Sequence, residues 1–149
     1  MMGLRGVSIV VVLLTTVGFA HADPEFGVND AERATYAEEC IRGSLAYNSL
    51  ISEMDARNLF EDVPPEIAES INYHVFQAGE VARFWSMFLA DQEGKEVALS
   101  TVRRLNALPG VFDADQEITK QMLEADREII DHCDAQIEPA LDFLKSRKG

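Results

Sequence analysis

The chain has 149 residues, of which 26 are Asp or Glu and 13 are Lys or Arg, so its formal net charge is −13 at pH 7. A surface this acidic repels nucleic-acid phosphates and anionic membranes, which leaves basic proteins, basic peptides and cations as the electrostatically favoured partners. The length suits one domain with its own hydrophobic core, and the sequence contains no internal repeat or low-complexity segment.

The first 22 residues have the three parts of a secretory signal peptide. Arg5 precedes an apolar run over residues 7–19, and the small-x-small tripeptide at 20–22 is a cleavage site. The run is too short to cross a bilayer and no lipid-carrying cysteine follows it, so we expect no stable membrane anchoring. We expect cleavage after Ala22, which leaves 23–149 as one exported domain with a net charge of 12 − 26 = −14, in a bacterial periplasm or outside the cell.

Two long helices are predicted in the first half of the exported domain. Apolar residues recur at helical spacings over 30–59, and the first residue of that range is the expected N-cap. Residues 61–65 break the pattern, and Pro65 suits the first turn of a second helix because N–H groups there have no helical partner. This second helix should end near Asp91. Its apolar face is wide, so we expect residues 84–88 either to be wrapped by neighbouring helices or to be partly reserved for a partner chain.

A short third helix and a long fourth helix are predicted after these. The third covers residues 95–108 and ends at a Leu-Pro-Gly turn. We expect Asp113 to cap the fourth helix, with Gln116 as its capping-box partner, and we expect Pro139 only to kink it before its end near Arg147. The sequence therefore predicts an all-α, up-down bundle of about four helices, in which the second and fourth lie on a diagonal.

Cys40 and Cys133 are the two cysteines of the chain, and an exported chain passes into an oxidising compartment where such a pair forms a disulfide. If the first and fourth helices are antiparallel, a rise of about 1.5 Å per residue places the two cysteines within about one turn of each other. Gly43 lies one turn after Cys40, and its missing side chain allows the two backbones to approach. We predict an inter-helix disulfide that contributes roughly 4–5 kcal/mol on the chain-entropy model.

His74 and His132 each interrupt an otherwise apolar helical row. An imidazole in such a row can hold haem or a divalent metal ion, with Met54 or Met122 as a further ligand. Covalent haem attachment is excluded because the sequence has no Cys-x-x-Cys-His. The simpler interpretation is that each histidine bonds a neighbour at the boundary of the core. The two histidines should lie at different heights on diagonal helices, so we do not expect them to share one ion.

An acidic face is predicted on the fourth helix. Its members are Glu124, Glu128, Asp131, Asp134, Glu138 and Asp142. Residue 131 is about 200° around the helix from Cys133, so this face should point away from the first helix. A solvated face is the simplest interpretation, but several of these acids form like-charge i,i+4 pairs that only Arg127 offsets. This imbalance favours a docking face for a cationic partner.

Motifs of the main enzyme classes are absent from the sequence, including Gly-x-Ser-x-Gly, His-Glu-x-x-His and the phosphate-binding glycine loop. We therefore predict a binding module for a basic protein or peptide rather than an enzyme. The partner would bind the acidic face or the aromatic-rich part of the second helix, and a second copy of the chain is a further candidate partner. The alternative is a carrier of b-type haem or of a divalent metal.

Overall fold

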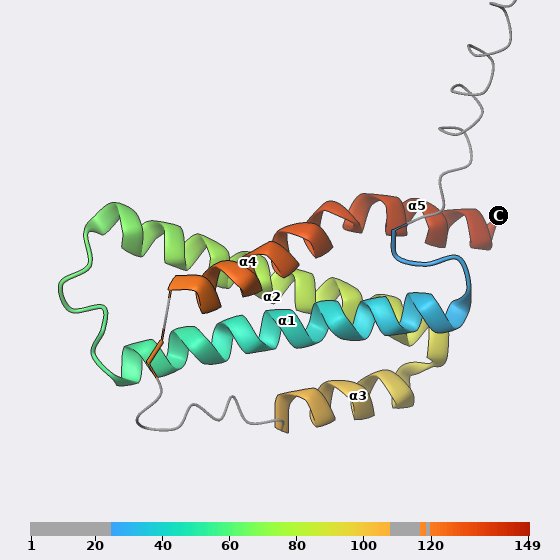
Figure 1. The fold of residues 1–149 in the computed structure, drawn as a ribbon. Coiled ribbons are helices and arrows are strands. Elements are labelled where there is room, and N and C mark those ends of the chain that lie inside the picture. Colours follow the sequence, from blue (N-terminus) through green and yellow to red (C-terminus); the bar gives the residue numbers. More distant parts are fainter. Residues whose placement is uncertain (1–24, 108–116, 119) are drawn as a thin grey trace, which may run out of the picture.

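The computed structural model describes residues 25–107, 117–118 and 120–149, which contain five helices and no strand (Figure 1). The helices are α1 (Asp30–Ala56), α2 (Pro65–Glu93), α3 (Lys95–Ala107), α4 (Lys120–Ala135) and α5 (Ile137–Lys148). Helices α1 to α4 alternate in direction and α5 continues from α4, so the predicted all-α, up-down bundle is confirmed. Within the described part of the chain, no helix has the length and apolar character needed to span a membrane.

The start of α1 is fixed by a reciprocal pair of hydrogen bonds. Its N-cap is Asn29, so the predicted cap, Asp30, was wrong by one residue. The Asn29 side chain accepts a hydrogen bond from the Glu32 backbone N–H at 2.9 Å, and the Glu32 carboxylate accepts one from the Val28 N–H at 2.8 Å. The first bond satisfies an N–H group that the start of a helix leaves without a partner, and the second ties the residue before the cap to the first turn.

The other ends of α1, α2 and α3 differ from the predicted ends by a few residues. Helix α1 stops at Ala56, three residues early, and Asn58 then takes a positive φ of 58°. Helix α2 continues two residues further than predicted, to Glu93, and ends at Gly94, whose φ of 96° suits a residue without a side chain. Helix α3 ends at Ala107, and the next residue lies outside the described part of the chain.

The predicted fourth helix is in fact two helices. Residues 117–118 are not helical, so α4 begins later than expected, and the predicted cap Asp113 and its partner Gln116 lie outside the described residues. The helix is interrupted at Gln136 rather than kinked. Pro139 has no N–H to donate, and its ring would clash with the carbonyl four residues earlier. It lies instead in the first turn of α5, where the missing N–H costs nothing.

Helices α1 and α2 form the centre of the bundle. Both α3 and α4 pack against this central pair, and no described residue of α3 contacts α4, which lies on the other side of α1 in Figure 1. The prediction that the second and fourth helices lie on a diagonal was wrong, because Trp85 Nε1 on α2 donates a hydrogen bond of 3.1 Å to the Cys133 carbonyl on α4. Trp85 and Phe88 are fully buried, so neighbouring helices cover one side of residues 84–88, whereas Met87 is 58% exposed.

The core extends beyond the helices to Phe26, in the segment that precedes α1. Its side chain is 1% exposed, and its ring centroid lies 5.7–6.3 Å from those of Trp85, Phe88 and Phe143. These tilted and edge-on contacts are favourable aromatic geometries. We did not predict this role from the sequence, because residues 25–29 show no periodicity that marks a buried position.

A disulfide joins α1 to α4, as predicted. Cys40 and Cys133 are bonded with their Cα atoms 5.8 Å apart, and both residues are buried. The prediction for Gly43 is also confirmed, since a Cβ atom there would lie 2.5 Å from Cγ2 of Ile129. Glycine at this position therefore lets α4 pack directly against α1.

Candidate functional site

A groove lies between α1, α4 and the segment that precedes α1. It consists of two hollows of about 430 Å³ each that share Tyr36 and Glu39. Its lining comes from residues 25–40 and from one face of α4 between Ala125 and Cys133. We term it the α1–α4 groove. The disulfide holds its two helical walls together.

The described residues that line this groove include four glutamates and no lysine or arginine. Of these, Glu32 is committed to the start of α1, where it accepts the Val28 N–H. Glu39 on α1 and Glu128 on α4 are both exposed, and neither has an ion pair or a hydrogen-bonded side chain among the described residues. The two walls of the groove therefore carry negative charge that their neighbours do not neutralise.

The fourth glutamate, Glu25, contacts His132 at the rim of the groove. The Nε2 atom of His132 lies 3.3 Å from Oε2 of Glu25, and Nε2 of Gln136 donates to the same oxygen at 3.2 Å. The His132 side chain is 55% exposed. Its imidazole is therefore at the surface rather than in the core. This imidazole is part of the polar rim of the groove.

Tyr36 forms much of the floor shared by the two hollows. Its ring meets the Trp85 ring edge-on at 5.0 Å and lies 6.0 Å from the His132 ring. Burial, followed by the negative charges of Glu25 and Glu39, raises the pKa of Tyr36 to about 12. The hydroxyl is therefore protonated at physiological pH. Its oxygen is buried and has no hydrogen-bond partner among the described residues.

The rest of the floor is apolar. Ile129 and the disulfide between Cys40 and Cys133 lie beside the Tyr36 ring along the same hollow. An apolar floor below unneutralised carboxylates matches the chemistry of a lysine or arginine side chain, which has an aliphatic stem and a cationic head. The groove is therefore suited to hold long basic side chains.

The structure distributes the six acids of the predicted acidic face among different neighbours, although all six are exposed. Glu128 belongs to the α1–α4 groove. Asp131 and Asp134 lie toward α2, where Nε2 of Gln77 donates to them at 3.2 and 3.1 Å. The two aspartates are thus already engaged within the domain.

The remaining three acids lie in the first halves of α4 and α5. Glu124 is paired with Lys120 at 3.4 Å, and Asp142 is paired with Lys145 at 3.3 Å. Glu138 is on α5, beyond the interruption that separates the two helices. Lysines therefore offset part of the like-charge repulsion that the sequence pattern indicated. Of the six acids, Glu128 is the one that lines the α1–α4 groove.

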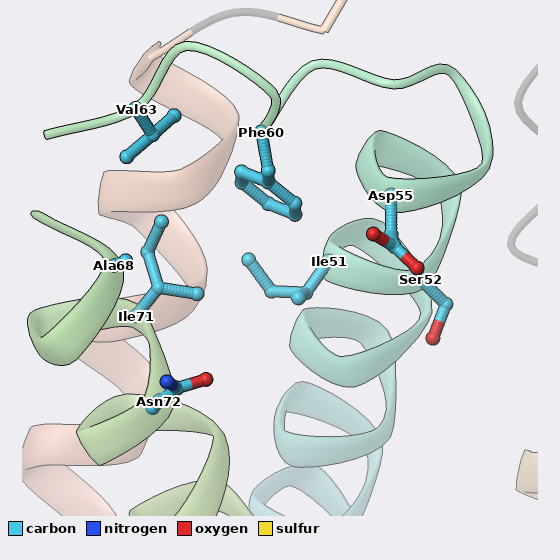
Figure 2. Close-up of a pocket in the computed structure, with 8 residues that line it drawn as sticks. All are labelled: Ile51, Ser52, Asp55, Phe60, Val63, Ala68, Ile71 and Asn72. Atoms are coloured by element: carbon cyan, nitrogen blue, oxygen red, sulfur yellow. The ribbon is translucent and has the colours of Figure 1, made fainter. Parts of the chain in front are cut away.

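A second kind of hollow lies at the turn between α1 and α2. Figure 2 shows Phe60 of the turn between Ile51 of α1 and Ile71 of α2, in a pocket of about 300 Å³. Asp55 is the one ionisable group among its eight lining residues. The lining is therefore mainly apolar and carries little charge that could select a ligand.

An adjoining pocket of about 280 Å³ brings together His74 and Met54, two of the predicted ligands. His74 is half-buried, and its Nδ1 donates a hydrogen bond of 2.6 Å to the Ser70 carbonyl, which leaves Nε2 as an acceptor. The other two predicted ligands, His132 and Met122, do not line this pocket. Among the described residues, no group of three or more His, Cys, Asp and Glu side chains is placed to hold a metal ion.

Three residues of the groove, Glu25, Tyr36 and Glu39, were missed by reasoning from the sequence. Tyr36 and Glu39 are three residues apart and so share one face of a helix, which was a usable signal. Their position beside α4 depends on how the disulfide orients the two helices, and this could not be read from spacing alone. The chain matches no family model, no curated protein and no solved structure.

Proposed function

We propose that this protein is an exported binding module that holds a basic peptide, or a basic segment of a partner protein, in the α1–α4 groove. The observation that carries the proposal is the pair of unneutralised carboxylates, Glu39 on α1 and Glu128 on α4, that line one hollow. The N-terminal signal pattern supports export, and the disulfide is compatible with it.

A lysine or arginine of the partner would place its stem on Tyr36 and Ile129 and its charged head beside Glu39 and Glu128. The net charge of −14 on residues 23–149 attracts cationic partners over a longer range and raises the rate of association. Affinity should therefore fall as salt concentration rises.

A fluorescence anisotropy titration tests this proposal with a labelled peptide of alternating lysine and leucine, and with a matched peptide that carries glutamate in place of lysine. The groove variant is Glu39→Gln with Glu128→Gln. The control variant is Glu93→Gln with Glu138→Gln, which removes the same charge from exposed positions outside the groove.

The groove variant should bind the basic peptide roughly tenfold more weakly, because each lost charge pair contributes up to about 1 kcal/mol and about 1.4 kcal/mol is tenfold in affinity. The control should remain within about twofold of the wild type. Equal weakening in both variants would show that binding follows net charge rather than the groove. Failure of the wild type to prefer the basic peptide would contradict the proposal altogether.

Haem or metal binding is a second candidate function, supported by the shared pocket of His74 and Met54. The ligands would be His74 Nε2 and the Met54 sulfur, a pair that suits haem iron and copper. Absorption scans with added haem, and separately with added Cu²⁺, would test this. A ligand-dependent band that is lost in His74→Ala but kept in His132→Ala would support it. Spectra that equal those of the free haem and the free metal ion would contradict it.

A further inference from the structure

The outer side of α2 carries four large side chains in one row. Phe76, Glu80, Arg83 and Met87 follow one another at spacings of four, three and four residues, which places them within about 60° of the helix circumference. We term them the α2 stripe. Phe76 is 68% exposed and Met87 is 58% exposed. The buried residues of α2 lie on the opposite side of the helix: Ala78, Val81, Trp85, Phe88 and Leu89.

The α2 stripe is complementary to itself. It has an apolar residue at each end and two opposite charges in the middle, in the order apolar, acidic, basic, apolar. A two-fold axis that passes between Glu80 and Arg83 places Glu80 of one copy opposite Arg83 of the other, twice. The same axis places Phe76 opposite Met87, twice, and a thioether against an aromatic ring is a favourable contact.

We propose that the α2 stripe is the interface of a homodimer in which the two α2 helices pack antiparallel. An interface of this kind uses the same patch on both copies, which is what the order of the four side chains provides. The charge pairs fix the register, and the apolar pairs supply the burial. The occupant of this surface is therefore a second copy of the chain. The stripe shares no residue with the α1–α4 groove, so the two proposals can fail independently.

Gly79 adds a separate argument for a closely packed partner on this side of α2. It lies in the helix interior, where glycine destabilises relative to alanine. A Cβ atom at this position would have nothing within 4 Å, so packing within the chain does not require a glycine there. The residue is exposed and lies beside the α2 stripe, where a missing side chain lets a second helix approach closely.

The dimer should be weak and salt-dependent. A single helix stripe buries less area than a standard stable interface, so we expect a dissociation constant of roughly 100 μM. Each chain carries a net charge of −14 over residues 23–149, and this overall repulsion opposes association. Added salt screens the repulsion, so dimerisation should strengthen as ionic strength rises. Binding of a basic peptide in the groove should weaken as salt rises. The two proposals therefore predict opposite salt dependences.

Sedimentation velocity of the secreted chain, over a concentration series that spans the micromolar to millimolar range, tests the proposal with two single variants. Glu80→Arg places two arginines opposite each other at each contact, and Arg83→Glu places two glutamates there. The dimer dissociation constant of each variant alone should be at least tenfold higher than that of the wild type. An equimolar mixture should dimerise as the wild type does, because every Arg then faces a Glu on the other chain.

The mixture isolates the contact between chains. Within one chain, Arg83 Nη1 lies 3.7 Å from Oε1 of Glu80, and both variants lose this pair without any recovery on mixing. Both positions are exposed, and circular dichroism should show unchanged helix content. Recovery in the mixture supports the interface. A wild type that stays monomeric at every concentration, or single variants that dimerise as the wild type does, would overturn it.

Discussion

Gly43→Ala and Gly79→Ala are the same substitution in helix interiors, and the structure gives them opposite effects. At Gly43 the new Cβ would lie 2.5 Å from Cγ2 and 3.3 Å from Cβ of Ile129. The helix propensity of alanine contributes about 1 kcal/mol, whereas overpacking a close contact costs about 1–3 kcal/mol. The disulfide prevents α1 and α4 from moving apart, so we take the upper part of that range. The net loss of stability should be about 1–2 kcal/mol.

Gly79→Ala is the matched control. The space around its Cβ is empty, so the propensity gain is unopposed and the free energy of unfolding should rise by about 0.5–1 kcal/mol. Urea unfolding followed by circular dichroism, at low micromolar concentration and with the disulfide intact, measures both changes. If Gly43→Ala were as stable as the wild type, the inferred close contact between α1 and α4 would be refuted.

A second substitution tests the contact itself. Ile129→Leu moves the branch of the side chain from Cβ to Cγ and so removes the methyl group that meets the new Cβ. The double variant of Gly43→Ala with Ile129→Leu should recover about half of the lost stability. The single variant Ile129→Leu should lose less than about 1.5 kcal/mol, since the two side chains have equal volume. Additive losses in the double variant would mean that Ile129 is not the residue that Gly43 accommodates.

Three further predictions follow from the core, the groove and the disulfide. Phe26→Ala should lower the free energy of unfolding by about 3 kcal/mol in the urea assay, because the ring is fully buried; a loss below about 1 kcal/mol would show that the segment before α1 adds little. Since the pKa of Tyr36 is raised to about 12, stability should hold up to pH 10 and then fall toward pH 12, as the unfolded state ionises first. Glu39→Gln should lower this pKa in a titration of phenolate absorbance, and an unchanged pKa would exclude the Glu39 charge as a cause. Reduction of the bond between Cys40 and Cys133 should cost about 4–5 kcal/mol, measured as the difference between oxidised and reduced urea curves; equal curves would contradict it.

The helices and the disulfide could be predicted because each depends on information that the sequence gives directly, either a local periodicity or a position along a helix. Apolar periodicity identified α1, α2 and α3 to within a few residues, and the heights of Cys40 and Cys133 along antiparallel helices placed them side by side. The division of the fourth helix also has a local cause in Pro139. Its effect is larger than a kink, since Pro139 has no N–H for the helical hydrogen bond and its ring clashes with the carbonyl four residues earlier.

The neighbours of each helix could not be predicted in the same way. Periodicity shows which side of a helix is apolar but not which helix covers it, so direct contact of α2 with α4 was missed. The groove depends on the same information, because Tyr36 on α1 and Glu128 on α4 are far apart in the sequence and line one hollow only when α4 packs against α1. Phe26 has no periodic context, since a single buried residue in a short segment of turns and bends has no repeat to reveal it.

Trp85 gives this domain a built-in optical reporter. It is the chain's single tryptophan, so all indole emission comes from one site. Its ring touches Tyr36 at the floor of the groove, and its indole N–H is bonded to the carbonyl of Cys133. A ligand that binds at Tyr36 and a reductant that cleaves the disulfide would each change the fluorescence of Trp85. Unlabelled protein can therefore be followed in real time, and emission wavelength and lifetime would distinguish a filled groove from an opened bundle.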